Sequence, residues 1–283
     1  MTDKSDIFLR DLSANDPETR KGAASMLGDF IDVRAVEPLI GLLQDERFDV
    51  RIAAASSLAV YKDGRAIEPL ISALNDPDIY VRVAVIRTLG ALGDARALDP
   101  LMTIFRNIEG LRATVIQAFG NISDPSIFNT IMSLVDDHDE DVRHAAAVAL
   151  GGYKNSLTLP ALTELSRDED TEVAEAATCS LGELGTREAV EPLTDLLSDE
   201  ELWYTHLAAV GALGDIGLPE CIAPLVQAAN NSNGLVQEVA VRMLGRFKDH
   251  RAVVALETIS SGEDQVLAQV AKATLEQINH PHG

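Results

Sequence analysis

The chain has 283 residues and a formal net charge of −22 at pH 7, with 45 acidic against 23 basic side chains. Nucleic acids and anionic membrane surfaces are bound mainly through clustered Lys and Arg, so this balance argues against both and leaves basic or neutral proteins as partners. Aromatic residues make up 4% of the chain and apolar residues 46%, a composition that favours closely packed helices over strands.

The predicted elements begin with a single helix over residues 5–14 and end with a single helix over residues 264–278. Eight helix pairs are predicted between them, which gives about eighteen helices. We expect no signal peptide and no membrane-spanning segment, because no stretch reaches ~20 apolar residues. Cys179 and Cys221 stand outside any CxxC pattern, so we expect reduced thiols in a cytoplasmic protein.

An anchor residue, Leu or Phe, closes the apolar run of each unit and recurs at intervals of 30 to 32 residues. A period in this range is typical of stacked helical repeats, in which no unit can bury its apolar face alone. The anchors are Leu27, Leu58, Leu89, Phe119, Leu150, Leu181, Leu213, Leu244 and Leu275.

Two helices are predicted in each unit, and their ends are marked by specific residues. The second helix is predicted to open at a Glu-Pro step such as Glu37-Pro38, because proline is tolerated in a first turn. The first helix is predicted to end at the Gly after the anchor, as at Gly90, where a left-handed conformation stops a helix. Its predicted capping residues include Asp16, Asp76, Asn107 and Asp168.

The unit between Asp76 and Leu101 resembles the short HEAT-like repeat of the phycobilisome-lyase type. The residues that carry the resemblance are Asp76-Pro77, Val81-Arg82, Leu89-Gly90, Gly93-Asp94 and Pro100-Leu101. The resemblance implies an all-α fold: a right-handed α-solenoid of about eight HEAT-like helix pairs with a single flanking helix at each end. It implies one such solenoid over residues 1–283.

An arginine column stands seven residues before the anchors of the first five units: Arg20, Arg51, Arg82, Arg112 and Arg143. Because a guanidinium reaches several acceptors at once, we predict a structural ladder to Asp carboxylates and carbonyls in neighbouring turns. A basic stripe that binds a ligand is the alternative. The later units hold Ala174, His206, Gln237 and Ala268 at this position, so the ladder is expected to stop after unit five.

Catalytic and metal-binding patterns are weak in this sequence. No His is followed by Glu, unlike the His-Glu pairs that bind di-iron in deoxyhypusine hydroxylases, a related HEAT-type class. His138 and His144 flank a run of acids that suits helix capping better than metal binding. His280 and His282 lie in a polar tail. We therefore expect no catalytic residue, no metal and no cofactor, and the charge argues against a HEAT-like DNA glycosylase.

The resemblance leaves one enzymatic alternative. Phycobilisome lyases attach open-chain tetrapyrroles to cysteines of antenna proteins, so the chain could be a bilin lyase subunit with a bound bilin. A phycobilisome-associated, chaperone-like accessory factor is a related alternative.

The favoured function is a non-catalytic scaffold or adaptor that holds a partner protein on the concave face and edge of the solenoid. The second helices are expected to line that face. Acidic residues precede the repeat prolines and are predicted to contact the partner: Glu37, Glu68, Asp99 and Glu191. The oligomeric state is left open.

The predicted binding centre is Trp203 and Tyr204, in a span from Arg187 to Arg242 that contains no Lys or Arg between its ends. Exposed aromatics among charged residues are typical of interface hot spots, and acids steer basic partners. The nearby acids included in the prediction are Asp195, Glu200 and Glu201. The alternative is that Trp203 fills space left where the arginine ladder ends.

Overall fold

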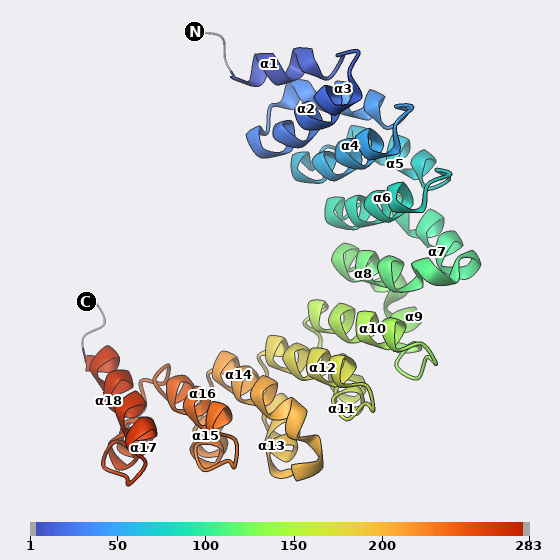
Figure 1. Ribbon diagram of the computed structural model, residues 1–283. Helices are drawn as coiled ribbons and strands as arrows, with labels where there is room; N and C mark the ends of the chain where they lie inside the picture. Colours follow the sequence, from blue (N-terminus) through green and yellow to red (C-terminus); the bar gives the residue numbers. More distant parts are fainter. Residues whose placement is uncertain (1–3, 280–283) are drawn as a thin grey trace. The chain divides into compact units, whose positions relative to one another are not determined.

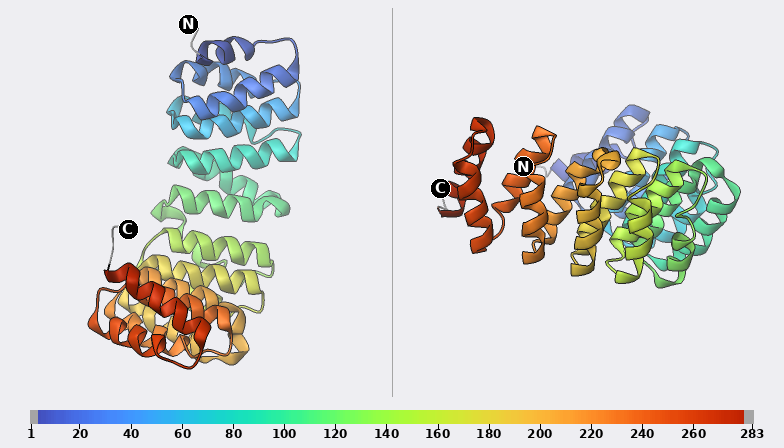
Figure 2. Two further views of the ribbon diagram at one scale, coloured as in Figure 1. Left: turned by 60° about the vertical axis from the view of Figure 1, so that its left-hand side comes forward. Right: turned by 90° about the horizontal axis from the view of Figure 1, so that it is seen from below.

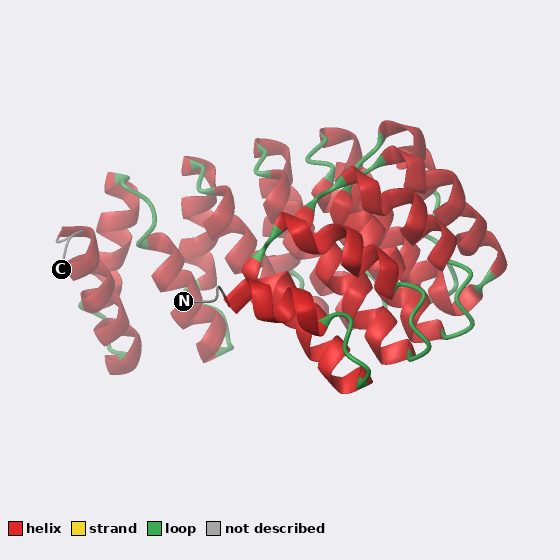
Figure 3. Ribbon diagram, turned by 90° about the horizontal axis from the view of Figure 1, so that it is seen from above, coloured by secondary structure: helices red, strands yellow, loops and turns green. Residues whose placement is uncertain are grey.

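The structure, a computed structural model, describes residues 4–279, and all of its regular secondary structure within that range is helical (Figures 1 and 3). Across these residues, every helix is too short or too polar to span a bilayer. The α-helices are α1 (Lys4–Asp11), α2 (Pro17–Phe30), α3 (Val36–Leu42), α4 (Phe48–Tyr61), α5 (Ile67–Ala73), α6 (Ile79–Leu92), α7 (Leu98–Asn107), α8 (Arg112–Ile122), α9 (Phe128–Met132), α10 (Glu140–Gly152), α11 (Leu159–Leu165), α12 (Thr171–Leu184), α13 (Val190–Ser198), α14 (His206–Ile216), α15 (Ile222–Ala228), α16 (Gly234–Leu244), α17 (His250–Ser260) and α18 (Gln265–Asn279).

These helices form the predicted pairs, α2 with α3 through α16 with α17, and α1 and α18 stand alone at the two ends. The prediction of an all-α solenoid of helix pairs is therefore confirmed. Residue contacts divide the chain into two compact units, residues 1–131 and 132–283. That the two units form one continuous solenoid stays a prediction.

Within each unit, the first helices of successive pairs lie side by side in one layer and the second helices lie in another (Figures 1 and 2). The apolar core lies between these layers. The anchors contribute to it because they are fully buried at Leu27, Leu58, Leu89, Phe119, Leu150, Leu181, Leu213 and Leu244. Leu275 is half-buried because α18 is the last helix of the stack.

The glycines after the anchors have a different role from the predicted one. Gly90 lies inside α6, and a Cβ atom placed there would meet the Cα atom of Ala118 on α8 at 2.7 Å. Glycine is therefore required because neighbouring first helices approach closely, and the prediction that it ends the helix was wrong. The chain turns left-handed three residues later, at Ile31, Lys62, Gly93, Ser123, Lys154, Gly185 and Gly217.

Hydrogen bonds between adjacent first helices accompany this close approach. The Ser57 hydroxyl on α4 donates to the Ala24 carbonyl of α2 over 2.8 Å. Thr88 on α6 donates to the Ala55 carbonyl over 2.9 Å in the same way. Since these hydroxyls are buried, each bond satisfies a polar group that would otherwise destabilise the layer.

The capping prediction was right for Asp16, whose side chain accepts from the Thr19 amide at the start of α2. At Asp76 and Asp168 it was wrong by two residues, because Asp78 and Asp170 cap α6 and α12. Asn107 is the last residue of α7 and caps no first helix. Asp76 and Asp168 instead receive arginine side chains from the preceding repeat.

Candidate partner-binding site

Arg20, Arg51 and Arg143 of the arginine column share one bonding pattern. Arg51 donates from Nε and Nη2 to the carboxylate of Asp76, at 2.7 and 2.8 Å, and from Nη1 to the carbonyl of Asp45 at 2.8 Å. Each such residue therefore joins a carboxylate 25 positions ahead to a carbonyl six positions behind. Arg20, bound to Asp45 and Ala14, and Arg143, bound to Asp168 and Asp137, share this pattern.

Arg82 departs from this pattern. Arg82 has an amide residue, Asn107, 25 positions ahead in place of an aspartate. Its buried Nε lacks a hydrogen-bond partner among the described residues. The guanidinium of Arg112 lies over the ring of Phe105, 5.0 Å from the ring centre. Repeat position alone therefore does not determine the contacts of these arginines.

Tyr204 supplies the missing contact where the column reaches Ala174. The carbonyl six positions behind Ala174 belongs to Asp168, and the Tyr204 hydroxyl donates to it over 3.3 Å. Burial raises the pKa of Tyr204, and the nearby carboxylate of Asp168 raises it further, so the phenol keeps its proton at neutral pH. We call the set of hydrogen bonds that one residue of the column makes to neighbouring turns a rung. Tyr204 therefore replaces part of an arginine rung.

His206 continues the column in neutral form. Its Nε2 lies 3.0 Å from the Asp199 carbonyl, and its Nδ1 lies 3.2 Å from Nδ2 of Asn231, again 25 positions ahead. Asn231 Oδ1 accepts the backbone amide of Asn233 at 2.9 Å, which fixes the orientation of the Asn231 amide. The imidazole therefore carries its proton on Nε2 and accepts at Nδ1. Arginine ends after unit five, but Tyr204 and His206 keep hydrogen bonds between neighbouring turns in the next two units.

Trp203 lies beside Tyr204 but remains exposed. It lies in a 3-10 segment, Glu200–Thr205, which is kinked at Leu202. Trp203 is 67% exposed, and its ring meets that of Tyr204 edge-on with the centres 6.0 Å apart. The alternative in which Trp203 fills the space left where the arginine ladder ends is therefore wrong. Tyr204, which reaches the Asp168 carbonyl, occupies that space.

A hollow of about 720 Å³ opens beside Trp203. Its walls come from two successive inter-repeat turns, with Glu200, Trp203 and His206 on one side and residues 230–233 on the other. Gln227 also lines it. Because His206 accepts a hydrogen bond at Nδ1 and is neutral, Glu200 provides the only charge in this lining.

The predicted acidic residues fall into two groups. Glu37 and Glu68 are paired with arginines of the next repeat, Arg65 at 3.0 Å and Arg96 at 3.8 Å. The remaining acids are exposed and have no ion pair among the described residues: Asp99, Glu191, Asp195, Glu200 and Glu201. Of these acids, only Glu200 lines the hollow. Ser198, the last residue of α13, lines it too, whereas Glu191 lies at the start of that helix.

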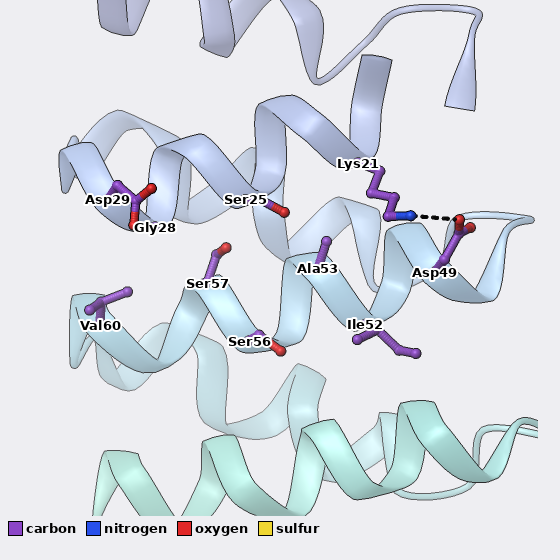
Figure 4. A pocket seen from close by; sticks show the side chains of 10 residues that line it. All are labelled: Lys21, Ser25, Gly28, Asp29, Asp49, Ile52, Ala53, Ser56, Ser57 and Val60. Atoms are coloured by element: carbon purple, nitrogen blue, oxygen red, sulfur yellow. Dashed lines mark hydrogen bonds and ion pairs between the residues drawn. The ribbon is translucent and has the colours of Figure 1, made fainter. Parts of the chain in front are cut away.

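A second hollow, which the sequence did not indicate, lies between α2 and α4 in the first unit (Figure 4). Its volume is about 490 Å³, and Lys21 forms an ion pair with Asp49 across it at 3.3 Å. Hydrogen bonds from Arg47 and then Lys21 lower the pKa of Asp49 to about 2. Lys21 and Asp49 are therefore paired with each other, and Asp29 is the other charged residue of the lining (Figure 4).

The histidines do not form a metal site within residues 4–279, where no cluster of His, Cys, Asp and Glu is arranged to hold a metal ion. His138 lies 3.2 Å from the carboxylate of Asp137. His280 and His282 lie outside the described residues.

Three solved structures resemble the chain along most of its length. Human deoxyhypusine hydroxylase in complex with glycerol is 18% identical, with 90% of this chain and 99% of that one covered and a TM-score of 0.42. The complex of CpcE and CpcF of phycocyanin lyase from Nostoc sp. PCC7120 is 21% identical, with 98% and 96% covered and a TM-score of 0.43. An engineered protein is 18% identical, with 98% and 99% covered and a TM-score of 0.43.

A comparison with curated proteins finds no significant match. The family model for HEAT repeats, in contrast, matches the sequence six times in overlapping segments. The matched residues are 6–66, 42–109, 107–181, 143–209, 159–225 and 191–276. Together with the stacked helix pairs, these matches identify the chain as a member of the HEAT-repeat family.

Proposed function

We propose that the protein is a non-catalytic scaffold that binds a basic protein segment at the hollow beside Trp203. The observation that carries the proposal is the 67% exposure of this tryptophan at the mouth of an acidic hollow. Large aromatic side chains that a partner can cover contribute strongly to interface energies. The Tyr204 hydroxyl donates a hydrogen bond to the Asp168 carbonyl, and this bond fixes the ring against which Trp203 packs edge-on.

The charge of the surroundings supports a basic partner. Glu200 and Glu201 are exposed and lack ion pairs among the described residues. The basic residues nearest in the sequence already form ion pairs: Arg187 with Glu220, Arg242 with Glu238 at 2.7 Å, and Arg167 with Asp199, the residue before Glu200, at 3.3 Å. An uncompensated acidic surface accelerates the association of a positively charged partner and makes it sensitive to salt.

A pull-down from a native-host extract tests the proposal. Trp203→Ala is compared with wild type and with Tyr80→Ala, a matched control because Tyr80 is a 68% exposed aromatic in the first unit. We expect the same protein to be retained by wild type and by Tyr80→Ala, to be lost from Trp203→Ala, and to be released by added salt. Equal retention by all three proteins would place the binding surface elsewhere.

The bilin-lyase alternative rests on the sequence resemblance alone. Co-expression with a bilin source and an apo-antenna protein tests it directly, because lyase activity would yield a covalently coloured antenna protein. We expect no coloured product beyond that formed without this chain.

A further inference from the structure

The hydrogen-bonding groups of the hollow beside Trp203 are unevenly used. Asn231 donates one N–H of Nδ2 to His206 and accepts at Oδ1 from the Asn233 amide. Asn230 donates from Nδ2 to the Val226 carbonyl over 3.1 Å. One N–H of each of these two amides is therefore directed into the protein itself, whereas Nδ2 of Asn233 makes no hydrogen bond within residues 4–279.

The groups that remain include the one charged acceptor of the lining. The Glu200 carboxylate and Oδ1 of Asn230 have no hydrogen-bond partner within residues 4–279, and the Gln227 side chain is also unused there. All three side chains line the same hollow as the exposed ring of Trp203. The hollow therefore offers one negative charge, additional oxygen acceptors and one aromatic face.

A guanidinium group matches this set of features. It carries five N–H donors in a rigid plane and no acceptor, it is always charged, and it stacks on aromatic rings. An ammonium group is compact and strongly hydrated and presents no planar face to the ring, so it gains less from the same contacts. We infer that the hollow receives an arginine side chain of the partner, stacked on Trp203 and bonded to Glu200 and Asn230. This inference rests on the proposed function and specifies the residue that is recognised.

Trp203 is the only tryptophan in the chain, so its fluorescence reports directly on the hollow. Three blocked pentapeptides, identical except for a central Arg, Lys or citrulline, are titrated into the protein at constant ionic strength. We expect a saturable change with the Arg peptide, roughly tenfold weaker binding of the Lys peptide, and little response to the uncharged citrulline peptide. Equal responses to Arg and Lys, or no response to Arg, would overturn the inference.

Glu200→Gln tests the carboxylate, and Glu201→Gln is its matched control because Glu201 is exposed but does not line the hollow. We expect Glu200→Gln to weaken binding of the Arg peptide roughly tenfold and Glu201→Gln to change its affinity by less than about twofold. If both substitutions weaken binding of the Arg peptide equally, the acids act only through long-range electrostatic attraction, and the inference is contradicted. The pull-down with Trp203→Ala decides the proposed function separately, so arginine selectivity can fail while that function stands.

Discussion

The rung at Arg51 and the rung at His206 occupy the same position in the repeat but use different chemistry. Arg51 carries a charge and neutralises the carboxylate of Asp76, whereas His206 is neutral and meets the amide of Asn231. Both rungs join consecutive turns. The difference lies in the charge balance. The arginine rungs compensate acids within the chain, whereas beside the neutral rung Asp199 pairs with Arg167 and Glu200 and Glu201 have no ion pair among the described residues.

The largest expected effect is at the charged rung. Arg51→Ala removes four hydrogen bonds and leaves Asp76, whose side chain is 7% exposed, without its counter-charge. Breaking such a pair from one side typically costs about 3 kcal/mol of unfolding free energy. Urea denaturation followed by circular dichroism measures this loss. Arg96→Ala, at a more exposed ion pair, serves as the control and should cost about 0.5 kcal/mol.

Acid should weaken the charged rung selectively. The hydrogen bond from Arg20 lowers the pKa of Asp45 below its usual value of about 4. A lowered folded-state pKa means that the stabilisation is present above about pH 4 and is lost as the pH falls through the lowered pKa. The difference in melting temperature between wild type and Arg20→Gln should therefore shrink below pH 4. A difference that stays constant down to pH 2 would contradict this assignment.

The neutral replacement at Tyr204 should contribute less. Tyr204→Phe removes the hydroxyl that donates to the Asp168 carbonyl and keeps the ring against Trp203. The expected loss is about 1 kcal/mol of unfolding free energy, with partner binding unchanged. Denaturant titration and the pull-down measure the two quantities. If Tyr204→Phe instead loses binding at full stability, the separation of roles between Tyr204 and Trp203 is wrong.

The smallest effect is expected at Arg82. Its buried Nε donor lacks a partner among the described residues, and the facing position is Asn107 in place of an aspartate. Removing a buried donor that makes no hydrogen bond costs little, so Arg82→Ala should change the unfolding free energy by less than about 0.5 kcal/mol. A loss as large as that of Arg51→Ala would show that sequence position determines the rung regardless of its acceptor.

The helix pairs were predictable because the 31-residue spacing of anchors such as Leu58 and Leu89 is visible in the sequence. The role of Gly90 was not, because a close approach to Ala118 depends on the distance between two helices. The different roles of Trp203 and Tyr204 were also hidden. The Tyr204 hydroxyl bonds a carbonyl 36 residues earlier, and such a contact has no local signal. Sequence reasoning found the region of the candidate site but not its hollow.

The left-handed turn that ends the first helices bears on how such a chain can change during evolution. Gly93, Gly185 and Gly217 adopt this conformation without strain, whereas Ile31 and Lys62 adopt it at φ 48°. A side chain in this region costs roughly 1 kcal/mol relative to glycine, and a β-branched one more. Repeats with non-glycine turns are therefore below their attainable stability. A lineage could regain stability at these turns after destabilising substitutions elsewhere, without changing any residue of the binding surface.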